Sequence, residues 1–178
     1  HPFYQYPCSK ESYKTFAVTI SRIDFDKNTD IILKANQLIK DSKKKVQIFG
    51  AENRLYVHHK LGELDFYNFW KGKFEKDYPL VYEGKDILKD CSYVVDMSTI
   101  KNDGGGSQYT FLEAIYQSCV LVLHRNWLTP DSIFKEGVNC LAAETPEELA
   151  KLLSETRDTT NLIKESRKLL DPHLQVTW

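Results

Sequence analysis

The chain has 178 residues, of which 42% are hydrophobic, and a formal net charge of −1. This length suits one ordinary globular domain and is short for two. Basic and acidic residues nearly balance, so the basic footprint of nucleic-acid-binding proteins is missing and we expect no nucleic-acid partner. No apolar run reaches the roughly 20 residues of a membrane helix, and no signal peptide is visible. We expect a cytoplasmic protein, and peripheral membrane contact stays open.

The first residues, HPFYQYPCSKESYKT, contain two prolines and have no hydrophobic periodicity. We interpret residues 1–15 as a linker or lead-in segment and residues 16–178 as a single domain. Because the chain starts with His1 instead of methionine, we expect a piece of a longer protein, and a natural single domain remains the alternative.

Strand-like and helical patterns then alternate along the chain. The first part predicts a strand at 16–21, a helix over 31–39, a strand at 45–50, a helix over 52–64, a strand at 65–72, and a short strand or turn with a short helix within 78–91. The second part predicts strands at 92–98, 119–124 and 140–143, and helices over 107–118, 145–155 and about 160–170. The alternation of helices with continuous apolar strands predicts an α/β fold, a Rossmann-like parallel sheet with helices on both faces.

The helix over 31–39 has one apolar stripe, made by Ile31, Ile32, Ala35, Leu38 and Ile39. We expect Asn28 or Thr29 to cap its start. In the helix over 145–155, Thr145 is expected at the N-cap and Pro146 at the first helical position.

Ligands of such sheets bind beyond the carboxyl ends of the strands. Three loops are therefore candidates for a binding site, namely 21–28, 50–53 and 98–107.

The cysteines and the lysine run receive structural interpretations. The four cysteines are widely spaced, so we expect neither a metal site nor a disulfide framework, and we interpret Cys91, Cys119 and Cys140 as reduced core residues. Lys43–Lys45 is expected to be a solvated helix end. His124 ends a strand at the binding edge, where it either approaches a sugar hydroxyl or has a structural role.

A run of three glycines, Gly104–Gly106, precedes the helix over 107–118. Glycines permit positive φ and leave room for a ligand close to the backbone. The N–H groups at the start of the following helix attract phosphate or another anion. A surface turn without a ligand is the alternative.

Charged residues add to the binding site predicted at this helix start. Glu113 lies on the flank of the helix and has the two acceptor oxygens that a ribose diol requires, although a solvated glutamate is the common alternative. Arg22 and Lys27 follow the first strand, and two cations at the edge of the sheet suit a diphosphate. Alternatively, they form an ordinary basic loop paired with Asp24 and Asp26. Together, these features indicate a nucleoside diphosphate.

The chain resembles the C-terminal, donor-binding domain of GT-B glycosyltransferases of the retaining family 4 type, over roughly residues 16–156. The resemblance rests on motifs in the family's order, which are TISRIDFDKNTDIILKANQLI with Arg22 and Lys27, VQIFG, VVDMS, LEA with Glu113, SCVLVLH, and FKEGVNCLAAETPEELAKLL. It implies one half of a GT-B enzyme, whose N-terminal acceptor-binding domain is absent from this chain.

The resemblance also implies roles for particular residues. Arg22 and Lys27 would bind the diphosphate of a nucleotide-sugar (NDP-sugar) donor and stabilise the leaving nucleotide, as catalytic residues. Glu113 would hold the ribose hydroxyls. The backbone around the helix start would contact the phosphates or the sugar, at Gly105, Gly106, Ser107, Gln108 and Tyr109. The reaction would transfer a hexose to an acceptor with retention, without a metal or another cofactor.

One departure concerns the family's first glutamate, which typically contacts the sugar. Its position, eight residues before Glu113, is occupied by Gly105, and Asp103 lies two positions earlier. A catalytically silent nucleotide-binding domain and a protein-interaction module therefore stay as alternatives. An NAD-dependent oxidoreductase is disfavoured because no G-x-G-x-x-G follows the first strand. The base, the sugar and the acceptor are not specified by the sequence.

Overall fold

A computed structural model describes residues 15–21, 23, 27–50, 53–71, 88, 91–98, 106–128, 130 and 132–170, and only the backbone of 15, 106–110 and 127. The expected lead-in segment lies outside the described residues except for Thr15, as does most of 78–91.

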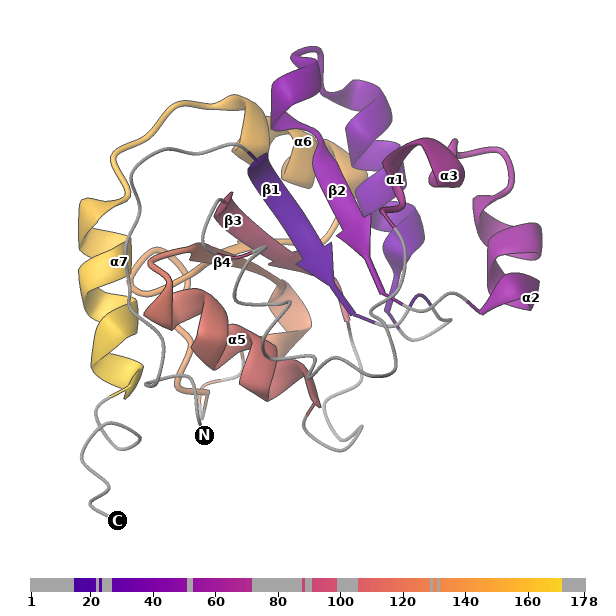
Figure 1. The fold of residues 1–178 in the computed structure, drawn as a ribbon. Helices are drawn as coiled ribbons and strands as arrows, with labels where there is room; N and C mark the ends of the chain where they lie inside the picture. Colours follow the sequence, from indigo (N-terminus) through magenta and orange to yellow (C-terminus); the bar gives the residue numbers. More distant parts are fainter. Residues whose placement is uncertain are drawn as a thin grey trace.

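The described residues form a five-stranded sheet in which all neighbouring strands are parallel (Figure 1). The strands are β1 (Thr15–Ile20), β2 (Val46–Phe49), β3 (Cys91–Asp96), β4 (Val120–His124) and β5 (Leu141–Ala143), in the order β2-β1-β3-β4-β5. Every residue of β4 and β5 is buried, as expected for strands covered on both faces. The predicted Rossmann-like fold is confirmed.

Helices cover the two faces of the sheet (Figure 1). Helix α1 (Thr29–Leu38) packs beside α6 (Pro146–Ser154) on one face, and α5 (Gly106–Tyr116) covers the other. Helices α2 (Arg54–Tyr56) and α3 (Phe66–Phe69) lie on the side of the edge strand β2 (Figure 1), and the π-helical turn η3 (Val57–Leu61) follows α2 directly. The remaining elements are the 3-10 turns η2 (Ser42–Lys44), η4 (Arg125–Trp127) and η5 (Lys168–Leu170), and helix α7 (Thr160–Arg167).

Each face of the sheet has its own apolar core. On the α1 and α6 face, the side chains of Ile32, Leu33, Ile48, Leu149 and Leu153 are almost completely buried. The core on the α5 face contains Val18, Val94, Phe111, Ile115 and Leu121. The sheet is therefore held between two layers of helices.

The three described cysteines are buried and carry free thiols, as predicted. The sulfur atoms of Cys91 and Cys119 lie 3.5 Å apart in the core on the α5 face. Burial raises the pKa of the Cys140 thiol to about 12, so this side chain stays protonated at neutral pH.

The predicted strand at 65–72 is wrong. Residues Phe66–Phe69 form helix α3, and Trp70 makes an isolated bridge to Ile48. The rings of Phe66 and Trp70 stack with centroids 5.7 Å apart, a contact that the helical spacing of four residues permits. Aromatic residues favour strands only where a sheet offers them neighbours on its surface, so the composition of this segment was misleading.

Helix α1 also differs from its prediction. Leu38, expected in the apolar stripe, is 50% exposed, whereas Leu33 and the polar Asn36 are completely buried. The Asn36 amide hydrogen-bonds both backbone groups of Val46: Nδ2 donates to the carbonyl oxygen at 3.0 Å, and Oδ1 accepts from the N–H at 2.8 Å. This pairing fixes the start of β2 against α1. The N-cap of α6 is confirmed, since the Thr145 hydroxyl accepts from the N–H of Glu148 at 3.1 Å.

Candidate functional site

The strand order creates a topological switch point between β1 and β3. The chain leaves β1 through α1 on one face to reach β2, and leaves β3 through α5 on the opposite face to reach β4. The helices that follow these two adjacent strands thus lie on opposite faces of the sheet, α1 on one and α5 on the other (Figure 1). Open α/β sheets bind ligands at such a switch point. The candidate loops 21–28 and 98–107 are the two that begin here.

A hydrogen bond joins the two sides of the switch point. Asn28 Nδ2 donates to the carbonyl oxygen of Met97 at 2.9 Å. Asn28 has a left-handed backbone (φ 51°, ψ 41°), and its side chain does not cap α1. The expected capping role is therefore wrong, and the amide instead connects the start of α1 to the end of β3.

Lys27, the residue before Asn28, is buried, with only 5% of its surface exposed. Lysine is almost never this buried unless its ammonium group has polar partners. The structure thus places one of the two predicted diphosphate-binding cations at the head of α1, beside the switch point. The other, Arg22, lies outside the described residues, so its role remains a prediction.

Gly50 fixes the neighbouring loop after β2. Its φ is +141°, and a Cβ atom there would lie 1.8 Å from the carbonyl oxygen of Ser21. The loops after β1 and β2 are also joined by backbone hydrogen bonds, from Ser21 N–H to Phe49 at 3.2 Å and from Asn53 N–H to Ile23 at 2.8 Å. The glycine that ends the second strand is therefore required by the close approach of two backbones.

Helix α5 contributes its amino end to the same edge of the sheet. It begins at Gly106, and Ser107, Gln108 and Tyr109 continue its first turn. The first N–H groups of a helix have no partner within the helix and attract anions. Gly105 and Asp103 lie outside the described residues, and the contacts predicted for these backbone groups remain predictions.

Glu113 lies seven residues beyond Gly106, about 10 Å along the helix axis. Its side chain is half-buried on α5, and this burial raises the pKa of the carboxyl group to about 7. Perturbed carboxyl groups of this kind are more frequent at functional sites than elsewhere. The solvated surface glutamate considered as the alternative would keep a pKa near 4.5.

Asp96 is a buried polar residue of the site that sequence reasoning missed. It is 3% exposed at the end of β3, and its Oδ1 accepts from the N–H of Ser98 at 2.8 Å. The carboxylate shapes the first turn of the chain after β3. The available signal was one aspartate at the end of the apolar run YVV.

An ion-pair network at the ends of β4 and β5 was also missed. The Arg125 guanidinium pairs with Glu136 through Nε at 3.1 Å, with Glu144 through Nη1 at 2.7 Å, and with Glu148 through Nη2. These contacts connect η4 to the end of β5 and the first turn of α6, and they lower the pKa of Glu148. Such convergence from distant segments leaves no local sequence pattern.

His124 has a structural contact. It is buried at the end of β4, and its Nδ1 accepts from the N–H of Asn126 at 3.2 Å, which starts η4. Burial lowers the pKa of this imidazole, so the ring is neutral at pH 7. This contact favours the structural interpretation over an approach to a sugar.

Two further findings concern only the part of the chain that the structure describes. In it, no group of three or more His, Cys, Asp or Glu side chains is placed to hold a metal ion. No helix among these residues is long and apolar enough to cross a membrane. Metal independence remains a prediction.

No sequence-family profile and no curated relative matches the chain. Solved structures do match. The chain is similar to Anabaena HepE in complex with UDP and glucose (TM-score 0.63, 17% identity, 89% of this chain and 44% of HepE covered). It is also similar to the C-terminal domain of a glycosyl transferase group 1 family protein, LpcC, from Francisella tularensis (TM-score 0.65, 14% identity, 93% of this chain and 89% of the LpcC domain covered). A third similar structure is S. aureus TarM (TM-score 0.68, 17% identity, 93% of this chain and 34% of TarM covered).

The coverage shows which part of these proteins the chain corresponds to. It spans less than half of HepE and about a third of TarM, but most of the isolated LpcC domain. At these low identities, the similarity establishes the fold. The chain therefore has the fold of a Rossmann-like domain of GT-B glycosyltransferases.

Proposed function

We propose that this chain is the NDP-sugar-binding domain of a retaining, metal-independent glycosyltransferase that transfers a hexose to an acceptor. The observation that carries this proposal is the switch point between β1 and β3, which Asn28 bridges to Met97. The buried Lys27 lies on one side of it and the amino end of α5 on the other. A cation and a helix end at one edge suit the two charges of a diphosphate.

In this proposal, the diphosphate lies between Lys27 and the first N–H groups of α5. When the bond to the sugar breaks, negative charge develops on the leaving diphosphate, and preorganised cations and N–H groups stabilise it. Arg22, directly after Ser21 in the sequence, would add a second cation. Charge-assisted hydrogen bonds of this type contribute about 1.5–3 kcal/mol each.

Glu113 is proposed to accept hydrogen bonds from the ribose hydroxyls. This requires the ionised carboxylate, whereas the pKa of about 7 leaves much of the free protein protonated at neutral pH. Binding of the diol favours the charged form and lowers the pKa. Nucleotide affinity should therefore rise as the pH increases through 7.

We propose UDP as the nucleotide, because HepE and TarM were both crystallised in complexes that contain UDP. The acceptor would bind to a second domain, since GT-B enzymes react between two domains and this chain spans less than half of HepE. Sugar transfer is accordingly proposed for the two-domain protein and nucleotide binding for this chain.

Calorimetry and thermal melting with UDP, GDP, ADP, CMP, NAD and phosphate, without added metal, test this proposal. A ligand at about 100 times its Kd stabilises the folded state by roughly 2.7 kcal/mol. We expect UDP to bind, and Arg22→Ala, Lys27→Met and Glu113→Gln to weaken its binding. The matched controls Lys60→Met and Glu147→Gln change exposed residues of the same types and should have no effect. Equal binding of UDP by all five variants would refute the site.

Release of UDP from a UDP-hexose, measured on the two-domain protein, separates a transferase from a catalytically silent domain. The silent alternative has one specific observation in its favour, the glycine at position 105 where the family typically has a glutamate. UDP binding without turnover for any acceptor and hexose would support that alternative.

A further inference from the structure

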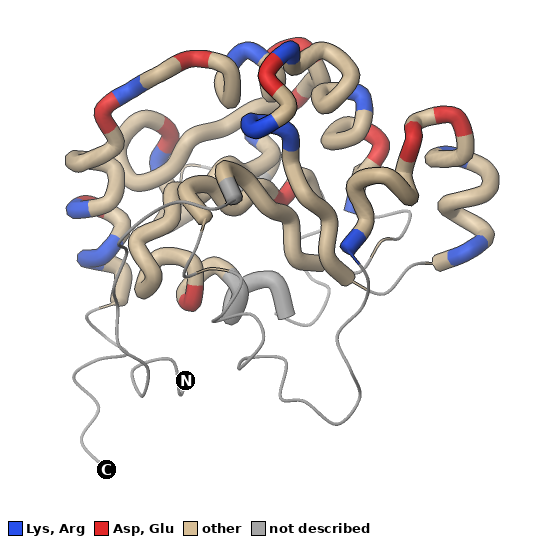
Figure 2. The backbone as a smooth tube through the Cα atoms, turned by 45° about the horizontal axis from the view of Figure 1, so that its top comes forward, with Lys and Arg blue, Asp and Glu red and all other residues tan. Residues whose placement is uncertain are grey.

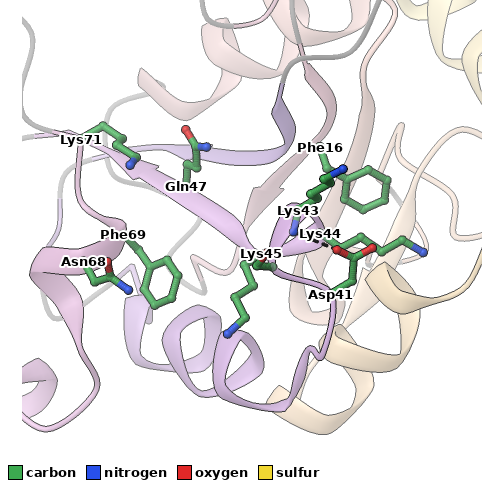
Figure 3. Close-up of a pocket in the computed structure, with 10 residues that line it drawn as sticks. Phe16, Asp41, Lys43, Lys44, Lys45, Gln47, Asn68, Phe69 and Lys71 are labelled. Carbon is green, nitrogen blue, oxygen red and sulfur yellow. Dashed lines mark hydrogen bonds between the residues drawn. The ribbon is translucent and has the colours of Figure 1, made fainter.

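A lysine-lined pocket lies along the edge strand β2 (Figure 3). It has a volume of about 740 Å³, and its charged lining includes Lys43, Lys44, Lys45 and Lys71. The rings of Phe16 and Phe69 form part of its wall. This volume lies in the range of small-molecule sites, which is about 300–1,000 Å³.

Three separate segments build this pocket, and two of them carry its lysines. On one side, the Asp41 carboxylate accepts from the N–H of Lys43 at 3.0 Å, which starts η2 and directs three consecutive lysines around the turn into β2. On the other side, the N–H of Lys71 donates to the carbonyl oxygen of Ile48 at 2.8 Å, in the middle of β2. The backbone thus holds lysines that are 26 positions apart in the sequence around one pocket.

The lining has a strong excess of positive charge. Four lysines and one aspartate are among the described residues that line the pocket, which gives three surplus positive charges. Lys44 Nζ donates to the carbonyl oxygen of Ser154 at 3.0 Å, and Lys45 Nζ lies 5.8 Å from the centre of the Phe69 ring. Gathered like charges destabilise a folded protein, and a bound anion removes this repulsion.

This pocket is separate from the candidate nucleotide site. Lys45 comes directly before β2, and Gly50 directly after it, which corresponds to about 16 Å of extended chain. The lysine run therefore lies toward the amino end of the sheet, whereas Lys27 and the start of α5 lie at the carboxyl edge. One nucleotide diphosphate cannot occupy both places.

We propose that this pocket binds a multiply charged phosphate ester, which is either a free phosphorylated molecule or the headgroup of an anionic lipid. Lysine is a common phosphate ligand that acts as a point charge, and Lys43, Lys45 and Lys71 together suit an anion with more than one charge. The aromatic wall accommodates the apolar part of an ester.

Two probes distinguish the sources. Inorganic pyrophosphate, titrated by calorimetry into protein saturated with UDP, represents the free ligand. Phosphatidylcholine vesicles with and without phosphatidic acid, in a sedimentation assay at 0.15 M salt (about physiological), represent the lipid. Binding of pyrophosphate alone supports a free ligand, and binding to the anionic vesicles alone supports a headgroup. Absence of binding to both probes overturns the proposal.

A matched pair of variants tests the location. The triple change Lys43→Gln, Lys45→Gln and Lys71→Gln should weaken binding by about tenfold or more. The control Lys60→Gln, Lys151→Gln and Lys164→Gln removes the same charge from exposed positions outside the pocket and should change it less than about twofold. Equal losses would overturn the pocket in favour of non-specific attraction. Lys27→Met removes the cation proposed for the diphosphate of the nucleotide and should leave binding to the lysine-lined pocket unchanged, which separates this outcome from the nucleotide site. Melting curves verify that every variant is folded.

Discussion

The two ends of β2 carry polar features of opposite kinds. At the carboxyl end, Gly50 brings two loops together through their backbones, and the nearby cation Lys27 is buried. Toward the amino end, lysines gather at the surface. Figure 2 shows Lys and Arg (blue) along the turn before β2, whereas the sheet itself is mostly tan. The close approach of two loops thus shapes the carboxyl end, whereas the lysines of a local run and Lys71 gather toward the amino end.

The largest expected effect comes from Gly50→Ala, which tests whether backbone contact determines the carboxyl end. The added Cβ would overlap the Ser21 carbonyl, so we expect a loss of about 3 kcal/mol in the free energy of unfolding, measured by urea denaturation. Gly137→Ala is the control: Gly137 has φ +79° but no atom within 4 Å of the added Cβ. It should cost only about 1 kcal/mol. Similar losses in both variants would show that strain in φ, and not the contact, determines the effect.

A smaller effect is expected at the amino end from Asn36→Ala. This change leaves the N–H and carbonyl groups of Val46 without their side-chain partners and should cost about 2 kcal/mol. Urea denaturation measures it, with the exposed neighbour Gln37→Ala as control. A loss below about 0.5 kcal/mol would mean that water replaces the amide and that β2 does not depend on α1 for its start.

The pH dependence of UDP affinity, compared between the wild type and Glu113→Gln, tests the role of Glu113 at the carboxyl edge of the sheet. In the wild type, UDP affinity should rise by about tenfold, or about 1.4 kcal/mol, between pH 6 and 8 as the carboxyl group with pKa about 7 ionises. The phosphate of UDP also titrates in this range, so the difference between wild type and variant is the relevant quantity. Parallel pH profiles would contradict the ribose role.

The raised pKa of the Glu113 carboxyl group also predicts how the stability of the fold depends on pH. Its folded pKa of about 7 exceeds the ordinary 4.5, so the folded state binds more protons between these values. Folding stability from this group is therefore present below pH 4.5 and is lost as pH rises to 7. As the pH rises from 4.5 to 7, the Tm of Glu113→Gln, measured by thermal melting, should therefore rise relative to the Tm of the wild type. A constant difference in Tm across these pH values would contradict the raised pKa.

The smallest effect concerns the surface charges. Without ligand, the triple lysine variant of the pocket should be more stable than the wild type by about 0.5 kcal/mol at low salt, because repulsion is removed. The gain should vanish at 1 M salt, where the Debye length is about 3 Å. Thermal melting at both salt concentrations measures this, and a gain that persists at high salt would point to packing instead of charge.

The sequence predicted what depends on periodicity and topology. Apolar strands alternating with helices are enough to predict a parallel sheet, and the carboxyl-end rule then selects the loops around Lys27 and Gly106. It did not predict contacts between distant segments. The bond from Asn28 to Met97, the Arg125 network, and the meeting of Lys71 with Lys43–Lys45 each join residues whose separation along the chain carries no pattern. Because the sequence does not reveal the approach of Lys71, the run Lys43–Lys45 on its own favours the interpretation of a solvated helix end.

The position of β2 at the edge of the sheet has a consequence for association between molecules. An apolar edge strand with open backbone groups is a template for pairing with another chain and leads to aggregation. Here Trp70 and Lys71 pair with Ile48, and lysines flank the strand at its start. Charge and backbone cover together protect this edge, so the lysines that would attract a phosphate ester also discourage strand-to-strand contact between copies of the protein.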